Sequence, residues 1–203
     1  MNSASTTTSS RWVYRSIDLM TIAMLGVAFG VVFWGWGKLY AIVDVGVKLG
    51  FPPAAGLMGG GWLIAGVVAG LVVRKPGAAL IAEVIAASVS ALMPGNEWGT
   101  AVLVSGALQG LGAELIFAVV GYRVYAPVVA ILAGMLAGVF EALYEWQAWY
   151  SDWGLDYRVV HLGFFMVSGA VIAGFGGWLL VRALARAGAL DAFEAGRDEV
   201  VKV

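Results

Sequence analysis

Six long apolar stretches, separated by short segments that carry all the prolines and most of the charges, constrain this chain more than any other feature. The hydrocarbon core of a bilayer is about 30 Å thick, and a helix needs about 20 apolar residues to cross it. The 203 residues can hold six such crossings with short connections. The chain is therefore predicted to be an all-α polytopic membrane protein, a compact bundle of six transmembrane helices. The predicted helices span residues 17–36, 57–73, 77–93, 100–120, 128–149 and 159–184.

The residues outside these stretches are divided among short segments, which leaves little sequence for a second domain. We expect one membrane domain, with a polar N-terminal segment 1–16, a bundle 17–187 and a solvated tail 188–203. The first ten residues lack the basic, apolar, small-residue order of a cleaved signal peptide, so the first stretch is expected to persist as a helix. The segment 37–56, which contains two prolines, is predicted to be the longest loop and a gate on the outer side.

Composition excludes several classes of function. Hydrophobic residues make up 61% of the chain, and the net charge is -1 with dispersed basic residues, so no nucleic-acid partner is expected. The absence of cysteine removes disulfides, thiolate nucleophiles and cysteine-based metal sites. We expect no metal site and no cofactor.

The distribution of Lys and Arg predicts the orientation, because cytoplasmic loops carry the excess. Seven basic residues fall at the ends and even-numbered loops, against three on the other side: Arg11, Arg15, Arg74, Lys75, Arg123, Arg182 and Arg186, against Lys38, Lys48 and Arg158. Both termini are therefore predicted to be cytoplasmic. The outer side instead gathers acids and aromatic residues: Asp44, Glu97, Asp152, Asp156, Trp98, Trp149, Tyr150 and Trp153.

Small residues recur at four-residue spacing in five of the stretches, which places them on one helix face and favours close packing of backbones. They are Gly26 and Gly30, Gly66 and Gly70, Gly106 and Gly110, Ala130, Gly134, Gly138 and Ala142, and Gly169, Ala173 and Gly177.

Ionisable groups at membrane depth cost about 2.5 to 3.5 kcal/mol or more unless they have a partner or a wet cavity. Glu83 lies in the cytoplasmic half and is expected to pair with a basic residue or a helix end. Glu114 continues the seam of Gly106 and Gly110 near mid-membrane, where interhelical hydrogen bonding and ligand binding both remain open. Gln109 lies about 140° from Glu114 around the helix, nearer the outer end. Its amide suits the edge of a heterocycle, although helix-to-helix bonding is the alternative.

Glu141, Glu145 and Trp149 follow one another at steps of four and form one stripe that rises toward the outer surface. Two carboxylates under an indole suit an organic cation, to which an aromatic face adds about 0.5 to 2 kcal/mol. The alternative is an interfacial aromatic belt that only anchors the helix. His161, the only histidine, starts the last helix on the same side, where a pocket or interface hydrogen bond is more plausible than a metal. Trp34 and Trp36 belong either to the pocket wall or to the belt.

Several segments resemble the S components, the substrate-capture subunits, of energy-coupling factor vitamin transporters, and among them the YkoE type. The resemblance covers most of residues 18–184 and is carried by the segments 29–34 (FGVVFW), 74–80 (RKPGAAL) leading to Glu83, 95–99 (GNEWG) and 109–114 (QGLGAE). It implies a six-helix subunit that binds thiamine or its hydroxymethylpyrimidine precursor from outside. It also implies partners, a transmembrane coupling subunit and ATP-binding-cassette ATPases, in a bacterial cytoplasmic membrane, and no enzymatic activity of its own.

Thiamine-binding S components of another type use a Glu-aromatic pair, a Gln about a dozen residues later and a Trp high on the fifth helix, and Glu97, Trp98, Gln109 and Trp149 are similar in order and spacing. The coupling face is a departure, since helix 1 offers Gly26 and Gly30 in place of an Ala-xxx-Ala pattern. The predicted substrate-binding residues are Trp34, Asn96, Glu97, Trp98, Gln109, Glu114, Glu141, Glu145, Trp149 and His161.

Two other functions are alternatives to substrate capture. An intramembrane serine protease is disfavoured, because Ser168 lies about 10.5 Å along the helix axis from His161 and the surroundings of Ser105 lack the usual Gly-x-Ser-Gly. A stand-alone channel or proton-coupled carrier for a small organic cation would relay protons through Glu83, Glu114 and Glu141.

Overall fold

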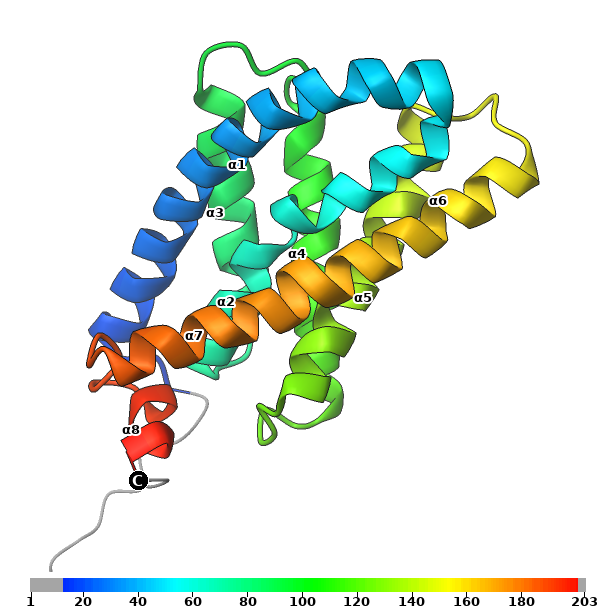
Figure 1. The fold of residues 1–203 in the computed structure, drawn as a ribbon. Helices are drawn as coiled ribbons and strands as arrows, with labels where there is room; N and C mark the ends of the chain where they lie inside the picture. The colour runs from blue at the N-terminus through cyan, green and yellow to red at the C-terminus, as the bar shows by residue number, and fades with distance from the viewer. Residues whose placement is uncertain (1–12, 201–203) are drawn as a thin grey trace, which may run out of the picture.

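The computed structural model describes residues 13–200, which contain helices and connections but no strand (Figure 1). Residues 1–12, including Arg11, and residues 201–203 lie outside the described part, as does the side chain of Lys48. The helices are α1 Ser16–Gly50, η1 Pro52–Trp62, α2 Ile64–Val73, α3 Ala78–Leu92, α4 Ala101–Val119, α5 Pro127–Ala148, α6 Leu155–Ser168, η2 Gly169–Gly176, α7 Gly177–Arg186 and α8 Glu194–Val200.

The all-helical prediction is confirmed, and each of the six apolar stretches coincides with a helical segment. Five segments are long and apolar enough to cross a membrane: Ser16–Asp44, Pro52–Val73, Ala101–Val119, Pro127–Ala148 and Leu155–Arg186. Helix α3 is apolar too but has only 15 residues. The predicted bounds of α3, α4 and α5 differ from the observed ones by one residue at each end.

The predicted end of the first helix and the loop 37–56 are wrong. Helix α1 continues to Gly50, and a 3-10 helix begins at Pro52. A single glycine such as Gly37 costs a helix about 1 kcal/mol but does not end it. The helix ends where proline forces the preceding residue out of the helical region, and Phe51 is extended at φ -138° and ψ 90°. The second half of α1 thus runs across the top of the bundle in Figure 1 as a helix.

Residues 155–186 form one continuous helical segment in which α6 passes through a π-helical stretch, η2, into α7. The segment packs along α5, and Gly134 of α5 meets Gly169 of η2. A Cβ atom built on either glycine would collide with the backbone of the other. The small-residue spacing predicted this kind of contact, and here it brings two backbones together without any side chain between them.

The other predicted small-residue faces also lie in helix contacts. Gly70 abuts the ring of Phe117, and Gly106 abuts Ala87. Gly26 and Gly30 face Ile85 and Val89 of α3. The pair on α1 therefore serves packing inside the bundle and does not present an outward coupling face.

One end of the bundle, called the terminal end below, holds Tyr14, α8 and the connection between α2 and α3 (Figure 1). There the fully buried carboxylate of Asp18 forms ion pairs with Arg15, at 2.7 Å, and Lys75, at 2.6 Å. The hydroxyl of Tyr14 donates to Pro76 O at 2.6 Å, and burial with the nearby carboxylates raises the pKa of Tyr14 to about 12. These contacts fasten the start of α1 to the α2–α3 turn.

Glu83 has the structural partner that the sequence suggested, a helix end. Its Oε2 atom accepts a 2.6 Å hydrogen bond from the backbone N–H of Gly66, in the first turn of α2. The first N–H groups of a helix have no partner within the helix, so a buried acceptor there satisfies a group that water cannot reach.

The predicted solvated tail 188–203 requires a correction. Leu190, Phe193 and Ala195 are buried, and α8 packs against α7 and α2. Three apolar side chains in a short segment were enough to dock it on the bundle, although the segment lacks the period expected of a long amphipathic helix.

Candidate functional site

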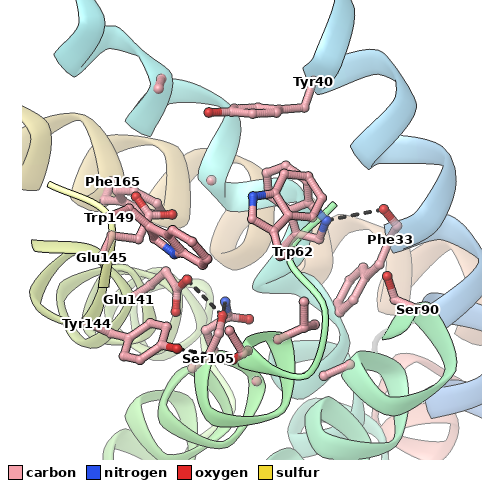
Figure 2. Close-up of a pocket in the computed structure, with 18 of the residues that line it drawn as sticks. Phe33, Tyr40, Trp62, Ser90, Ser105, Glu141, Tyr144, Glu145, Trp149 and Phe165 are labelled. Carbon is pink, nitrogen blue, oxygen red and sulfur yellow. Dashed lines mark hydrogen bonds between the residues drawn. The ribbon is translucent and has the colours of Figure 1, made fainter. Parts of the chain in front are cut away.

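A cavity opens at the other end of the bundle, called the cavity end below, and is bounded by α1, η1, α3, α4, α5, α6 and the α3–α4 and α5–α6 connections (Figure 2). It encloses about 860 Å³ of space, its open mouth included. Its aromatic lining consists of Phe33, Tyr40, Trp62, Trp98, Tyr144, Trp149, Tyr150 and Phe165. Its polar lining adds Ser90, Ser105, Gln109, Glu141 and Glu145.

The stripe predicted on α5 faces this cavity. Glu141, Glu145 and Trp149 all line it, with Glu141 deepest at 6% exposure and Trp149 at the rim at 47%. Steps of four residues on a helix stack side chains on one face, so the depth follows the order in the sequence. The helix therefore presents two carboxylates at successive depths to whatever enters the cavity.

A chain of polar side chains on the cavity floor orients Glu141. The amide of Gln109 donates to Ser105 Oγ at 2.7 Å, and Ser105 Oγ donates to Glu141 Oε1 at 2.8 Å. The second oxygen, Oε2, is buried and accepts no hydrogen bond from the residues that the structure describes. A buried acceptor without a donor is costly. Glu141 Oε2 is therefore suited to accept a hydrogen bond from a molecule in the cavity, or to pair with its positive charge.

Glu145 lies between the cavity and His161. The Nε2 atom of His161 is 3.3 Å from Glu145 Oε2, but the two are not aligned as a hydrogen bond. The imidazole is fully buried, and the edges of Tyr150, Trp153 and Phe165 surround it at ring-centre distances of 4.9 to 5.3 Å. His161 is thus placed behind the carboxylate and is not part of the cavity lining.

Three aromatic side chains from distant parts of the sequence form the roof of the cavity. The indole of Trp62 packs edge-on against Tyr40, at 5.3 Å between ring centres, and against Trp98, at 5.6 Å. Its Nε1–H donates to Phe33 O at 3.2 Å, as Figure 2 shows. This bond fixes the large ring of Trp62 in the wall of the cavity that Glu141 and Glu145 also line.

Tyr150 closes the cavity from the α5–α6 connection and stacks on Trp153 at 3.9 Å. Burial, with a smaller contribution from the charge of Glu145, raises the pKa of Tyr150 to about 12. Its hydroxyl therefore remains a neutral donor at any physiological pH.

Trp34, Asn96 and Glu97 lie beside the cavity and not in it; they line a smaller hollow that shares Phe33, Ser90 and Trp98 with it. Trp34 Nε1 donates to Pro94 O at 2.8 Å, and the Asn96 side chain accepts from the backbone N–H of Trp98 at 3.0 Å. Glu97 is exposed. The structure gives Trp34 and Asn96 the role of shaping the α3–α4 turn that presents Trp98.

Glu114 lies at the terminal end and does not line the cavity, so the structure favours interhelical hydrogen bonding over ligand binding, the two roles left open for it. Its carboxylate accepts hydrogen bonds from the backbone N–H groups of Gly77, Ala79 and Leu80 and from the hydroxyl of Tyr122, at 2.6 to 3.3 Å. It caps the first turn of α3, where a negative charge also complements the helix dipole. Because it is fully engaged there, the proposed relay through Glu83, Glu114 and Glu141 has no continuous path through it.

Sequence reasoning missed several lining residues, above all Tyr40, Trp62, Tyr144 and Ser105 as a binding group. Tyr40 lies beyond the residue where the first helix was expected to end. Trp62 lies in the apolar stretch 57–73, whose pattern does not indicate which of its side chains face a cavity. The one usable signal was Ser105, four residues before Gln109 and therefore on its face. Ser105 bonds to Glu141, and neither ring nitrogen of His161 has a serine partner within residues 13–200.

Three comparisons with known proteins each match this chain to a transport protein. A model of the family described as "ABC-type cobalt transport system, permease component" matches residues 17–140. The chain is 33% identical over 191 residues to the putative HMP/thiamine permease protein YkoE of Bacillus subtilis (strain 168), and the match covers 92% of each protein. It is also similar to a crystal structure of an S-component of an ECF transporter, with a TM-score of 0.86, 31% identity, and coverage of 94% of this chain and 95% of that one.

Proposed function

Because the chain belongs to the YkoE-type S components of energy-coupling factor (ECF) transporters, we propose that it captures thiamine or its hydroxymethylpyrimidine (HMP) precursor from outside the cell. The printed name of the Bacillus relative supports this class of ligand. The family consists of transporter subunits, so the chain is not an enzyme. The resemblance found in the sequence is thereby confirmed at the level of the family.

The arrangement of Glu141 and Glu145 carries the proposal for the ligand. Thiamine combines a permanent thiazolium charge with an aminopyrimidine that offers N–H donors. Glu141 Oε2 is a buried acceptor in need of a donor, and Glu145 adds a second carboxylate closer to the mouth. Trp62, Trp98 and Trp149 supply flat faces for a heteroaromatic ring. We therefore place the pyrimidine toward Glu141 and Gln109 and the cation toward Glu145.

Cobalt, which the matched family description names, is a poorer fit for this cavity. Within residues 13–200, no three residues among His, Cys, Asp and Glu are grouped so that they could hold a metal ion. Two carboxylates walled by eight aromatic side chains suit an organic cation better than a hydrated divalent metal.

Transport would need partners, because within residues 13–200 no path leads from the cavity through the bundle: a continuous apolar core that includes Leu63, Val67 and Phe117 fills it. We propose that the chain acts with a transmembrane coupling subunit and ABC ATPase subunits, needs no cofactor, and lies in a bacterial cytoplasmic membrane with six crossings. The terminal end carries Arg15, Arg74, Lys75 and Arg123, which supports placing both termini in the cytoplasm.

Calorimetry on the purified chain in detergent tests the ligand. Thiamine and HMP are expected to bind saturably without ATP, whereas choline, a cation without a pyrimidine, is expected to bind much more weakly. If neither thiamine nor HMP gives a binding isotherm, the ligand assignment is wrong while the family stands.

Reconstitution of the chain alone into liposomes separates this function from a stand-alone proton-coupled carrier. Radiolabelled thiamine should bind without accumulating, with or without a proton gradient. Sustained uptake that collapses when the gradient is removed would support the carrier.

A further inference from the structure

A second cavity lies at the terminal end, between the end of α2, the α4–α5 connection, α7 and α8. It encloses about 770 Å³, its open mouth included. Its polar lining is basic: Arg74, Arg123 and Arg182 contribute from three different elements. No Asp or Glu is found among the described residues that line it.

Aromatic rings hold two of these arginines in place. The guanidinium of Arg74 lies 4.4 Å from the ring centre of Tyr125, and that of Arg182 lies 4.7 Å from the ring centre of Trp178. A guanidinium placed over an aromatic ring keeps N–H groups along its edge, and such groups suit phosphate oxygens. Both arginines also make other contacts, which an incoming anion would join or replace.

The backbone fixes the position of Arg74 as well. Arg74 ends α2 in the left-handed conformation, at φ 58°, with its N–H bonded to Gly70 O at 3.1 Å. Its Nε donates to Leu71 O at 3.2 Å. A non-glycine residue rarely adopts this conformation, and here it directs a cation into the cavity.

Exposed apolar side chains lie close in sequence to the residues that line the cavity. Val124 and Val128 lie on the α4–α5 connection and the start of α5, and Leu179 lies on α7; each is 46 to 58% exposed. A basic cavity beside an exposed apolar surface, with a tryptophan at their border, combines the two environments that a phospholipid needs: cations for the headgroup and an apolar face for the chains.

We infer that this cavity binds the phosphate headgroup of an anionic phospholipid, with Arg74, Arg123 and Arg182 around the phosphate and the acyl chains along Val128 and Leu179. A free phosphate ester has the same headgroup chemistry but no use for the apolar flank. Lipid binding here is independent of the ligand in the other cavity.

Native mass spectrometry of the detergent-purified chain, titrated with phosphatidylglycerol or phosphatidylcholine, tests this inference. The double variant Arg123→Gln/Arg182→Gln removes two cations from the cavity and leaves Arg74, with its backbone role, intact. The matched control Arg186→Gln/Arg197→Gln removes two cations at the same end that do not line the cavity. The apparent affinity for phosphatidylglycerol should fall about tenfold or more in the first variant and less than about twofold in the control.

Three results would overturn the inference. One is an equal loss in both variants, which would mean that only the net charge matters. Another is equal binding of phosphatidylcholine and phosphatidylglycerol. The third is a site that inorganic phosphate occupies and that depends on Arg123 and Arg182 while phosphatidylglycerol binding does not, which would assign the cavity to a free phosphate. Matching thermal unfolding of the two double variants excludes misfolding as the cause.

Discussion

Ser105 of α4 donates a 2.8 Å hydrogen bond to Glu141 of α5, and this bond joins the two helices at the floor of the cavity. Because Gln109 donates to the same hydroxyl, the proton of Ser105 is directed at the carboxylate. One oxygen of Glu141 is thereby engaged inside the protein, and the other is left for a ligand. The first prediction follows from this division.

Replacing Glu141 by Gln should weaken thiamine binding by about tenfold or more, equivalent to about 1.4 kcal/mol or more, because the amide removes the charge and presents a donor where the ligand needs an acceptor. Glu145→Gln should weaken binding of thiamine more than binding of neutral HMP. Calorimetry with both ligands measures this. Glu97→Gln, an exposed carboxylate at the same end, is the control and should change neither affinity. Equal losses of both ligands in Glu145→Gln would contradict our placement of the cation.

Trp98→Ala should weaken thiamine binding by about tenfold or more, because the roof loses a ring that packs on both Trp62 and Tyr40. Trp34→Phe keeps an aromatic ring and loses only the bond to Pro94 O. Since Trp34 does not line the cavity, this second change should alter the affinity less than about threefold. A larger effect from Trp34→Phe than from Trp98→Ala would show that the α3–α4 turn, and not the roof, governs binding.

Glu114→Gln should lower stability and spare ligand binding. The amide offers one acceptor in place of two, so N–H groups at the start of α3 lose their partner, at a cost of about 1 to 3 kcal/mol. Thermal unfolding followed by intrinsic tryptophan fluorescence measures the loss, and calorimetry on the folded variant measures binding. A variant with unchanged stability but no thiamine binding would contradict this and would mean that Glu114 takes part in ligand binding.

Tyr150 should titrate late. Its pKa is raised to about 12, above the ordinary value near 10, so folding favours its neutral form. The stability that this preference contributes is complete below pH 10 and disappears as the pH rises from 10 to 12. Tyr150→Phe should therefore lose less stability than the wild-type chain over that interval. Ultraviolet absorbance should show one fewer late-titrating phenol in the variant, and a missing phenol near pH 10 instead would contradict the assignment.

Residues whose function depends on spacing along one helix were predictable from the sequence. The shared face of Glu141, Glu145 and Trp149 follows from steps of four, and the separation of Gln109 from Glu114 follows from a step of five. In the structure Gln109 lines the cavity and Glu114 lies at the other end. The sequence could therefore place side chains around a helix with useful accuracy.

Residues that depend on distant partners were not predictable. Glu114 faces the packed seam, as expected, but its partner is the start of α3, and nothing in the local pattern shows how far that helix end extends toward it. Tyr40 and Trp62 meet only because α1 continues past Gly37 and turns back at Pro52. Their contact is set by where two helices end, the feature that hydropathy defines least well.

The contact between Gly134 and Gly169 limits which substitutions this protein can accept during evolution. Neither position tolerates even a methyl group unless the opposing backbone retreats, so neither can vary alone. Glu145 lies eleven residues beyond Gly134, about 16 Å along the helix axis, and His161 lies eight residues before Gly169. A change in the distance between the two helices at Gly134 and Gly169 would also change the relative position of Glu145 and His161. The geometry around Glu145 and His161 thus depends partly on two glycines that do not line the cavity.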